Sequence, residues 1–333
     1  MKRKMLIYLF TILFLLTGMP LSFGWGIWGH KHINKAAVFA LPAELRTFFY
    51  NHIDFITEES VVPDIRKYTI NDKMEFARHY IDIEDFGMPV EDFPKTMKEA
   101  TSKFDSTLLQ KSGMLPWYIQ TITDKLTRAF KNKNKTEILF LAADLGHYIG
   151  DAHMPLHTSS NHDGQLTNQK GIHSFWESQL PELFGDRYNF YTGEAKFINN
   201  IADETWNIIK HSHQLADTVL ITEKKLRESF SKEKIYKTDS NKNILKNQYK
   251  QPVHTLEYAK KYHDALNGMV ENQMRAAIMA TASYWYTAWV NAGKPNVTSL
   301  DSEDLTNRNK KYLKEDMKAW TKGKITNLKI QNE

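Results

Sequence analysis

The sequence of 333 residues contains no cysteine. Disulfide bonds are therefore excluded, and so is a lipid anchor on a cysteine at the start of a processed chain. The fold must be stabilised by an ordinary hydrophobic core or by bound metal. A large excess of charge is also absent, because the formal net charge is only +5. Basic residues at positions 2–4 supply three of these charges, so bulk charge gives no argument for a nucleic-acid partner.

Glycine and proline are sparse, and no linker rich in either residue interrupts the chain. No internal repeat is present. Apolar residues recur with helical spacing nearly throughout, and few stretches show the alternation that predicts a strand. The sequence therefore predicts an all-α fold, with a single mostly helical domain over residues 25–300.

Four helical segments can be placed from this pattern and from breaking residues. Residues 30–60 predict two helices separated near Pro42, and residues 172–184 predict a shorter helix. Another segment begins at Thr136, which can cap it, and ends at Met154 before a proline. Residues 267–293 predict a long helix that ends at Gly293.

The first 24 residues are built like a secretory signal peptide. Three basic residues precede an apolar run to about Leu16, and small residues follow at Ser22 and Gly24. The run is short for a membrane span, which needs roughly 20 residues. An uncleaved anchor is the alternative, and Pro20 fits it less well. Cleavage after Gly24 would make Trp25 the new N-terminus of a periplasmic or secreted protein. Because the removed segment contains three basic residues and no acidic ones, cleavage would also lower the net charge from +5 to +2.

Charged stretches lie outside these helical segments. Residues 131–135 and 231–250 are rich in lysine, and we interpret them as solvated loops or helix ends. From Asp301 to the end, large apolar residues are scarce and charged residues abundant. Residues 301–333 are therefore predicted to form a loosely packed, charged C-terminal tail.

The densest group of possible metal ligands is HYIGDAHMPLH, which contains His147, Asp151, His153 and His157. His147 and Asp151 are four residues apart and would share one face of a helix, so both can coordinate one metal ion. Glycine precedes each of them, at a cost of about 1 kcal/mol in helix propensity. Glycine at these places indicates that another group approaches the helix backbone closely.

A second pair, His173 and Glu177, has the same four-residue spacing, and two such pairs suggest more than one metal ion. Asp64 and His79 occur earlier in the chain, and neither of them alone indicates a metal site. A single histidine on a helix is more often a core or surface residue than a ligand. The ensemble of histidines and carboxylates nevertheless indicates a site for zinc or another divalent ion.

The motifs can also be matched as an ordered set. W-x4-H begins at Trp25, and PD-x-R, RHYID, HxxGDxHxPLH and HxxWE follow. This set resembles the superfamily of trinuclear zinc phosphodiesterases, which contains the S-one/P-one single-strand nucleases and the bacterial zinc-dependent phospholipases C. The resemblance runs from Trp25 to about Leu180 and implies the helical fold of that superfamily.

The resemblance implies nine ligands for three zinc ions. One ion would be held by the free amine and the carbonyl oxygen of Trp25, with His30. Asp151 would bridge this ion to a second, and the third would have a separate ligand set. The remaining ligands are Asp64, His79 and His147 for the second ion, and His157, His173 and Glu177 for the third.

Other residues receive roles through the same resemblance. Asp64 would orient or deprotonate the attacking water as well as bind metal. Arg66 or Lys67 would place a positive charge opposite the phosphate, and the sequence leaves open which of the two does so. Tyr80, next to His79, is a candidate for stacking on a base, and packing beneath the ligand is the alternative.

The implied reaction is hydrolysis of a phosphodiester by a metal-activated water. Two branches of the superfamily compete for the substrate. W-x4-H and the interval from Asp64 to His79 favour a nuclease acting on single-stranded DNA or RNA, with 3′-nucleotidase activity as an extension. The short interval from His157 to His173 and the use of Glu177 favour a phospholipase C. A hypothesis of another class is an exported protein whose zinc is purely structural. None of these functional hypotheses requires an obligate protein partner.

Overall fold

The computed structural model of the chain describes residues 25–70, 72, 74–247, 250–301 and 307–330. The predicted signal peptide over residues 1–24 lies outside the described residues. Among the helices that are described, none is both long enough and apolar enough to cross a bilayer.

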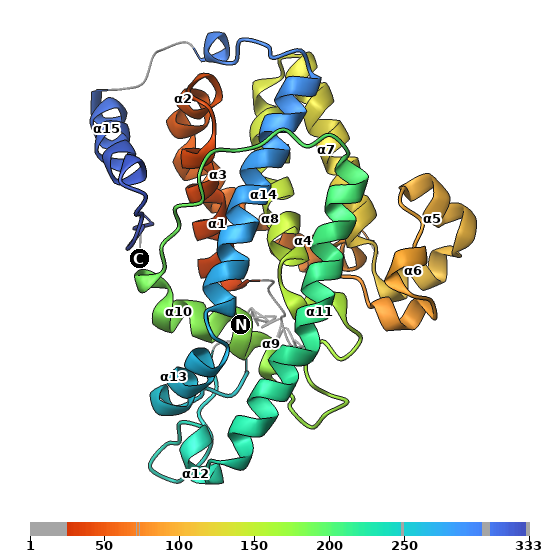
Figure 1. The fold of residues 1–333 in the computed structure, drawn as a ribbon, viewed down its shortest axis with the longest axis vertical. Coiled ribbons are helices and arrows are strands. Elements are labelled where there is room, and N and C mark those ends of the chain that lie inside the picture. Colours follow the sequence, from red (N-terminus) through yellow and green to blue (C-terminus); the bar gives the residue numbers. More distant parts are fainter. Residues whose placement is uncertain (1–24, 71, 73, 248–249, 302–306, 331–333) are drawn as a thin grey trace, which may run out of the picture.

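Helices make up most of the described chain and its β-bridges are isolated, which confirms the all-α prediction (Figure 1). Their bounds are α1 (Gly26–Ala40), α2 (Ala43–Asn51), α3 (Ile53–Glu59), α4 (Val62–Thr69), α5 (Met97–Lys103), α6 (Ser106–Ser112), α7 (Leu115–Lys131), α8 (Lys135–Ala152), α9 (Ile172–Ser174), α10 (Leu180–Phe184), α11 (Ile201–Glu228), α12 (Lys232–Ile235), α13 (Leu256–Ala265), α14 (Met269–Asn291) and α15 (Asn307–Thr321).

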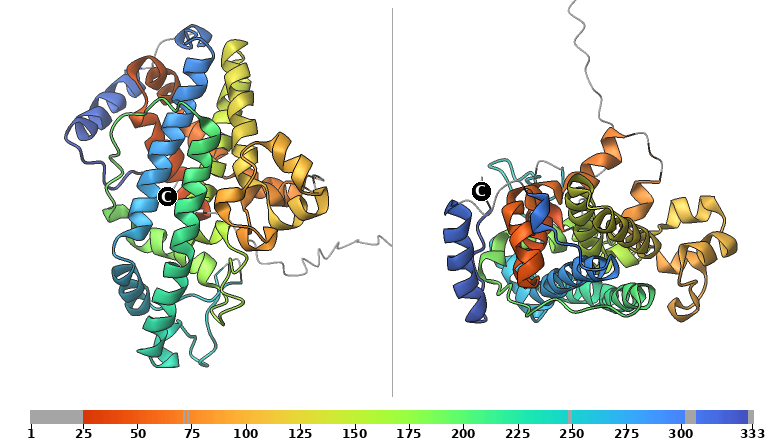
Figure 2. Two further views of the ribbon diagram at one scale, coloured as in Figure 1. Left: turned by 45° about the vertical axis from the view of Figure 1, so that its right-hand side comes forward. Right: turned by 90° about the horizontal axis from the view of Figure 1, so that it is seen from above.

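Long helices α1, α7, α8, α11 and α14 form the body of the molecule, and α5 and α6 project from one side of it (Figures 1 and 2). Large aromatic side chains fill the space between the helices. Trp285 of α14 stacks on Phe49 of α2 with ring centroids 4.9 Å apart, and its indole Nε1 donates to the carbonyl oxygen of Ala142 in α8. Burial of such residues supplies the core that a chain without disulfides needs.

The helices lie where the predicted segments were placed, with differences at several boundaries. Helix α8 ends at Ala152, two residues before the predicted end, and residues 172–184 contain a π-helical turn between α9 and α10. The break near Pro42 is present, but a second break at His52 separates α2 from α3. Helix α8 begins at Lys135, and its cap is Asn134, not Thr136, because the Asn134 side chain accepts a hydrogen bond from the Glu137 amide. The long helix α14 ends at Asn291, just before Gly293 in the left-handed region.

The C-terminal segment differs from the expectation of a loosely packed tail. Helix α15 lies along the outer side of α1 and α2 (Figure 2). Trp320, Ile325 and Ile330 are buried, and the Ile325 carbonyl accepts a hydrogen bond from the Phe190 amide. The described residues of this segment are therefore docked, because a few apolar side chains among the charges suffice to bury an edge against the domain. The division into a domain over 25–300 and a tail from 301 stays a prediction.

The close approach predicted beside the α8 glycines is found. A Cβ atom built on Gly146 would lie 2.0 Å from Oδ1 of Asn34 in α1, and one on Gly150 would lie 3.1 Å from Nδ1 of His30. The two glycines thus let α1 pack directly on α8. This contact brings the predicted ligands of the two helices together.

We expect Gly146→Ala to lower the free energy of unfolding by about 2 kcal/mol, because the added methyl must displace Asn34 from a packed core. The Asn34 amide donates to the carbonyl oxygens of Ile56 and Ala143, so its movement also costs hydrogen bonds. Urea unfolding at fixed zinc concentration measures the change. Thr136→Ala, at an exposed site on the same helix, is the control, with an expected change below about 0.5 kcal/mol. Equal stability of the two variants would contradict the packing argument.

Candidate metal centre

The sequence-predicted ligands from seven secondary-structure elements lie together in the interior. Helices α1 and α8 supply His30, His147 and Asp151, and α4 supplies Asp64. The remaining ligands come from the short turns η1 (Phe76–His79), η4 (Pro155–Thr158) and η5 (Phe175–Gln179), and from α9. Within the described residues, three groups of these side chains are spaced closely enough to hold a metal ion.

The first group is His30, His147 and Asp151. Nε2 of His30 lies 3.5 Å from Oδ1 of Asp151, and the His30 and His147 rings stack with centroids 3.8 Å apart. All three side chains are fully buried. Burial and neighbouring His147 lower the pKa of His30 to about 4, so its imidazole is neutral at physiological pH and has a lone pair for a metal.

The second group is Asp64, His79 and His147. Nδ1 of His79 lies 2.9 Å from Oδ2 of Asp151 and 3.6 Å from Oδ1 of Asp64. Nε2 of His147 lies 3.2 Å from the same Asp151 oxygen. Asp151 therefore faces both groups, with Oδ1 toward His30 and Oδ2 toward His79 and His147, as a bridging carboxylate must.

The third group is His157, His173 and Glu177. Nε2 of His173 lies 3.1 Å from Nε2 of His157 and 3.1 Å from Oε2 of Glu177. Glu177 lies in η5, a π-helical turn, which is a feature often found at functional sites. Burial raises the pKa of Glu177 to about 8, despite the opposing effect of His157. A divalent cation at this place would favour the ionised carboxylate.

Backbone carbonyl groups orient three of the imidazoles. Nδ1 of His147 donates to the Ser60 carbonyl, Nδ1 of His157 to the His79 carbonyl, and Nδ1 of His173 to the His162 carbonyl. A neutral ring that donates through Nδ1 presents the lone pair of Nε2 to its group. This is the second coordination sphere that metal-binding histidines usually have.

Several buried atoms of the groups have no hydrogen-bond partner in the described part of the chain. They are Nδ1 and Nε2 of His30, Oδ2 of Asp64, Nε2 of His79, Oδ1 of Asp151 and Oε2 of Glu177. An unsatisfied buried polar atom costs about 1–3 kcal/mol, and more when charged. Neutral imidazoles and carboxylates directed at common points are the ligands that zinc prefers, so these residues fit the implied ions.

Trp25 lies against the first group. Its side chain is fully buried, its indole Nε1 donates to the Gly150 carbonyl at 2.6 Å, and its ring packs on Trp176 at 4.9 Å. The residue has φ 44°, a left-handed conformation that is uncommon for tryptophan. The indole thus fixes the start of α1 beside Gly150 and near His30.

The two candidate cations of α4 lie in different places. Nζ of Lys67 is 2.7 Å from Oδ1 of Asp64, at the second group, and its side chain is 6% exposed. Arg66 turns away and pairs with Asp144 at 2.6 Å and with Glu75 at 3.6 Å. Burial lowers the pKa of Lys67, but Asp64 and Asp151 outweigh it and the pKa stands above its usual value. Lys67 therefore carries its positive charge into the site.

Tyr80 follows His79 and is partly buried, with its hydroxyl donating to the Lys111 carbonyl. Burial and the carboxylates of Asp82 and Asp85 raise its pKa to about 12. The two roles predicted for Tyr80, stacking on a base and packing beneath the His79 side chain, both remain predictions.

Sequence reasoning missed Glu75 and an aromatic pair. Glu75 is buried, accepts a hydrogen bond from the Tyr148 hydroxyl and lies 3.7 Å from Nε2 of His79. Tyr68 and Phe76 are 42% and 40% exposed and meet edge to face at 5.5 Å. Glu75 could have been found from its i,i+4 spacing to His79. No local sequence pattern indicates that Tyr68 and Phe76 form an aromatic pair.

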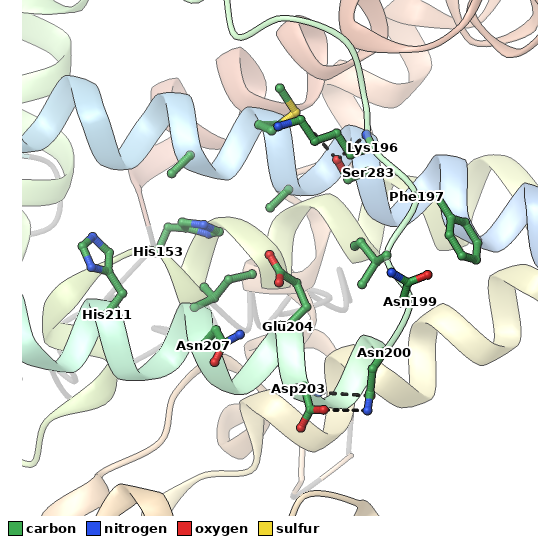
Figure 3. Close-up of a pocket in the computed structure, with 15 residues that line it drawn as sticks. His153, Lys196, Phe197, Asn199, Asn200, Asp203, Glu204, Asn207, His211 and Ser283 are labelled. Atoms are coloured by element: carbon green, nitrogen blue, oxygen red, sulfur yellow. Dashed lines mark hydrogen bonds between the residues drawn. The ribbon is translucent and has the colours of Figure 1, made fainter.

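His153, a fourth candidate in HYIGDAHMPLH, does not join the three groups. Its Nδ1 donates to the Ile149 carbonyl, and its ring lines a separate hollow between α11 and α14 (Figure 3). This hollow of about 680 Å³ is also lined by Glu204, Asn207 and His211. The position of His153, two residues after Asp151, turns it away from the metal groups.

Comparison with known proteins gives two findings. A family model described as S1/P1 nuclease matches residues 25–283. The chain is similar to Nuclease S1 of Aspergillus oryzae (strain ATCC 42149 / RIB 40), with 24% identity over 186 residues. This similarity covers 51% of the chain and 58% of the relative, so the chain spans somewhat over half the length of that protein. The matched family region begins at Trp25 and contains every predicted ligand.

Proposed function

The chain belongs to the S1/P1 nuclease family, within the phospholipase C/nuclease superfamily, and from this premise we propose that it is an exported, zinc-dependent endonuclease. Its substrates are single-stranded DNA and RNA, and 3′-nucleotides are further substrates. The observation that supports this proposal most strongly is the convergence of three buried ligand groups, several of whose atoms lack hydrogen-bond partners in the described chain.

The proposed ligand sets follow these groups. His30 and the terminal amine and carbonyl of a processed Trp25 would hold one ion, and Asp64, His79 and His147 would hold a second, with Asp151 available to both. A third ion would be held by His157, His173 and Glu177. Bound zinc would supply Lewis acidity for the phosphate and a water of lowered pKa.

The protein's own groups have separate tasks around the reacting phosphate. Asp64 has an oxygen that accepts the proton of the attacking water. Lys67, 2.7 Å from Asp64, holds a positive charge opposite the phosphate oxygens. The carbonyls of Ser60, His79 and His162 keep the ligand rings in one tautomer and one orientation, so no reorganisation is needed during the reaction.

The surface beside Lys67 supports a nucleic-acid substrate. Tyr68 follows Lys67 directly, and its ring forms with Phe76 an exposed aromatic pair. Stacking of a base on an aromatic side chain contributes about 1–3 kcal/mol and requires no particular sequence. A flexible single strand can present its bases to such a pair, whereas the bases of a duplex are stacked on one another.

A panel of substrates tests this function. The mature chain loaded with zinc is offered single-stranded DNA, RNA, 3′-nucleotides and phosphatidylcholine side by side. We expect hydrolysis of the single strands and the 3′-nucleotides, with phosphatidylcholine unchanged. Turnover of phosphatidylcholine alone would assign the chain to the phospholipase C alternative. No turnover of any substrate by a zinc-loaded preparation would favour a purely structural role for the metal.

Export and activity are linked through Trp25. A variant that retains one extra residue before Trp25 has a peptide nitrogen where the processed chain has an amine, and a peptide nitrogen does not bind zinc. We expect it to bind less zinc and to lose activity by about 100-fold, the scale of effects at metal ligands and their partners. Elemental analysis and single-strand hydrolysis measure both. If zinc content and rate match those of the processed chain, the amine ligand assignment is wrong.

A further inference from the structure

A compact lobe lies between α12 and α13, and its described residues, 236–247 and 250–254, are here named the lysine lobe. Its three short segments are closed into a ring by backbone hydrogen bonds. The Lys237 amide donates to the Val253 carbonyl, the Val253 amide donates to the Leu245 carbonyl, and the Leu245 amide donates to the Lys237 carbonyl. These residues recur every eight positions. The stretch is mostly exposed, as expected of solvated loops or helix ends, and these backbone hydrogen bonds connect its three segments to one another.

The lobe and the short helix before it carry a high local positive charge. Residues 231–250 contain six lysines and two acidic residues, whereas the net charge of the whole chain is +5. All six lysines are exposed, and in the described part of the chain none of them forms an ion pair: Lys232, Lys234, Lys237, Lys242, Lys246 and Lys250. The carboxylate of Asp239 is engaged by the backbone amides of Asn241 and Asn243.

The base of the lysine lobe rests on the turn that carries a ligand of the third group. Gln179 Nε2 donates to the Pro252 carbonyl at 3.0 Å, and the His254 amide donates to Gln179 Oε1 at 3.1 Å. The His254 ring stacks on Phe175 with centroids 3.5 Å apart. Phe175 and Gln179 are the first and last residues of η5, which contains Glu177. The lobe therefore adjoins the metal centre.

A buried carboxylate fixes the lobe from its other side. Glu223 of α11 accepts hydrogen bonds from Arg227, from the Tyr258 hydroxyl and from Gln169 Nε2. Arg227 in turn lies 3.4 Å from the Tyr236 hydroxyl at the start of the lobe. Gln169 belongs to the loop that leads to His173. These contacts hold the lobe and the third ligand group in one arrangement.

From this placement we propose that the lysine lobe is a second binding site for the phosphate backbone of the strand being cut, outside the metal centre. The inference rests on the proposed nuclease function and adds to it a preference for long strands over short ones. Exposed lysines bind phosphates as point charges and release counterions, independently of base sequence. A strand held at the metal centre continues over the adjoining lobe, whereas a dinucleotide ends before it.

The test compares two triple variants with equal loss of charge. Lys242→Asn, Lys246→Ser and Lys250→Asn remove three lobe lysines, with asparagine at the two positions of positive φ. The matched control is Lys125→Ser, Lys131→Ser and Lys133→Asn, around the α7–α8 turn at the opposite end of the bundle (Figure 1). KM and kcat are measured for a long single strand and for a dinucleotide over a series of salt concentrations.

We expect the lobe variant to raise KM for the long strand about tenfold at low salt, with kcat unchanged, and to flatten its salt dependence by about 0.7 logarithmic units per lost phosphate contact. Its dinucleotide kinetics and the control variant should match the unchanged enzyme. An unchanged KM for the long strand, or an equal rise in the control variant, overturns the proposal. If only binding to anionic phospholipid vesicles is lost, the lobe serves a lipid surface and the proposal is likewise wrong.

The proposed function and this inference can fail separately. If the unchanged enzyme cuts neither long strands nor dinucleotides, the function fails. Binding of a nuclease-resistant phosphorothioate strand by the zinc-loaded protein then decides the inference alone. Weaker binding by the lobe variant than by the control variant supports it, and equal binding overturns it.

Discussion

Asp151→Asn is expected to lower kcat/KM for single-stranded DNA by on the order of 10³ and to reduce the zinc content of the protein. Asp151 is fully buried, and its two oxygens face different ligand groups. Burial raises the pKa of Asp151, but His147 and His157 outweigh it and hold the pKa well below its usual value. The carboxylate is thus ionised, and asparagine keeps its shape while removing the charge that two cations would share.

Zinc content and single-strand hydrolysis are measured on the same preparation, with far-UV circular dichroism to show that the helices persist. Asp217→Asn, at an exposed position of α11, is the matched control and should change neither quantity. An Asp151→Asn protein with the zinc content and the rate of the control would contradict the bridging role.

Lys67→Met is expected to lower kcat by about 10²–10³ while leaving zinc content unchanged, because it removes a positive charge that faces the site but binds no metal. Arg66→Met is expected to act on stability instead. It leaves Asp144, 8% exposed, without its partner at 2.6 Å, at a cost of about 1–3 kcal/mol. Its kcat at saturating zinc should stay within about tenfold of the unchanged enzyme, since Arg66 lies outside the ligand groups.

The two variants control for each other, because they remove neighbouring cations of the same helix. Steady-state kinetics, urea unfolding and elemental analysis separate the three quantities. If Arg66→Met loses more kcat than Lys67→Met, the geometric choice between these residues is wrong.

The parts of the site that local spacing determines could be predicted from the sequence. His147 and Asp151, and likewise His173 and Glu177, are four residues apart on helical turns, so their proximity follows from helix geometry. The glycines of α8 also predicted a close neighbour, and the structure supplies Asn34 and His30. Assembly of the segments into one centre required the family resemblance, because helix periodicity does not fix which helices meet.

Features that depend on distant partners could not be predicted. Arg66 and Lys67 differ by one helical position, and only the placement of Asp144 and Asp64 decides which of them faces the metal groups. Leu313, Met317 and Trp320 have helical spacing, but the many charges around them give no basis for choosing the surface against which Trp320 is buried. The ring of the lysine lobe is closed by three separated backbone hydrogen bonds, and its composition alone is typical of a solvated loop.

Removal and return of metal tests the central claim most directly. The mature chain is analysed for zinc and for hydrolysis of single-stranded DNA before chelation, after chelation and after zinc is restored. Three ligand groups predict about three zinc ions per chain, loss of activity with the metal, and recovery when zinc returns. Full hydrolysis of single-stranded DNA by protein that contains no metal would contradict the account.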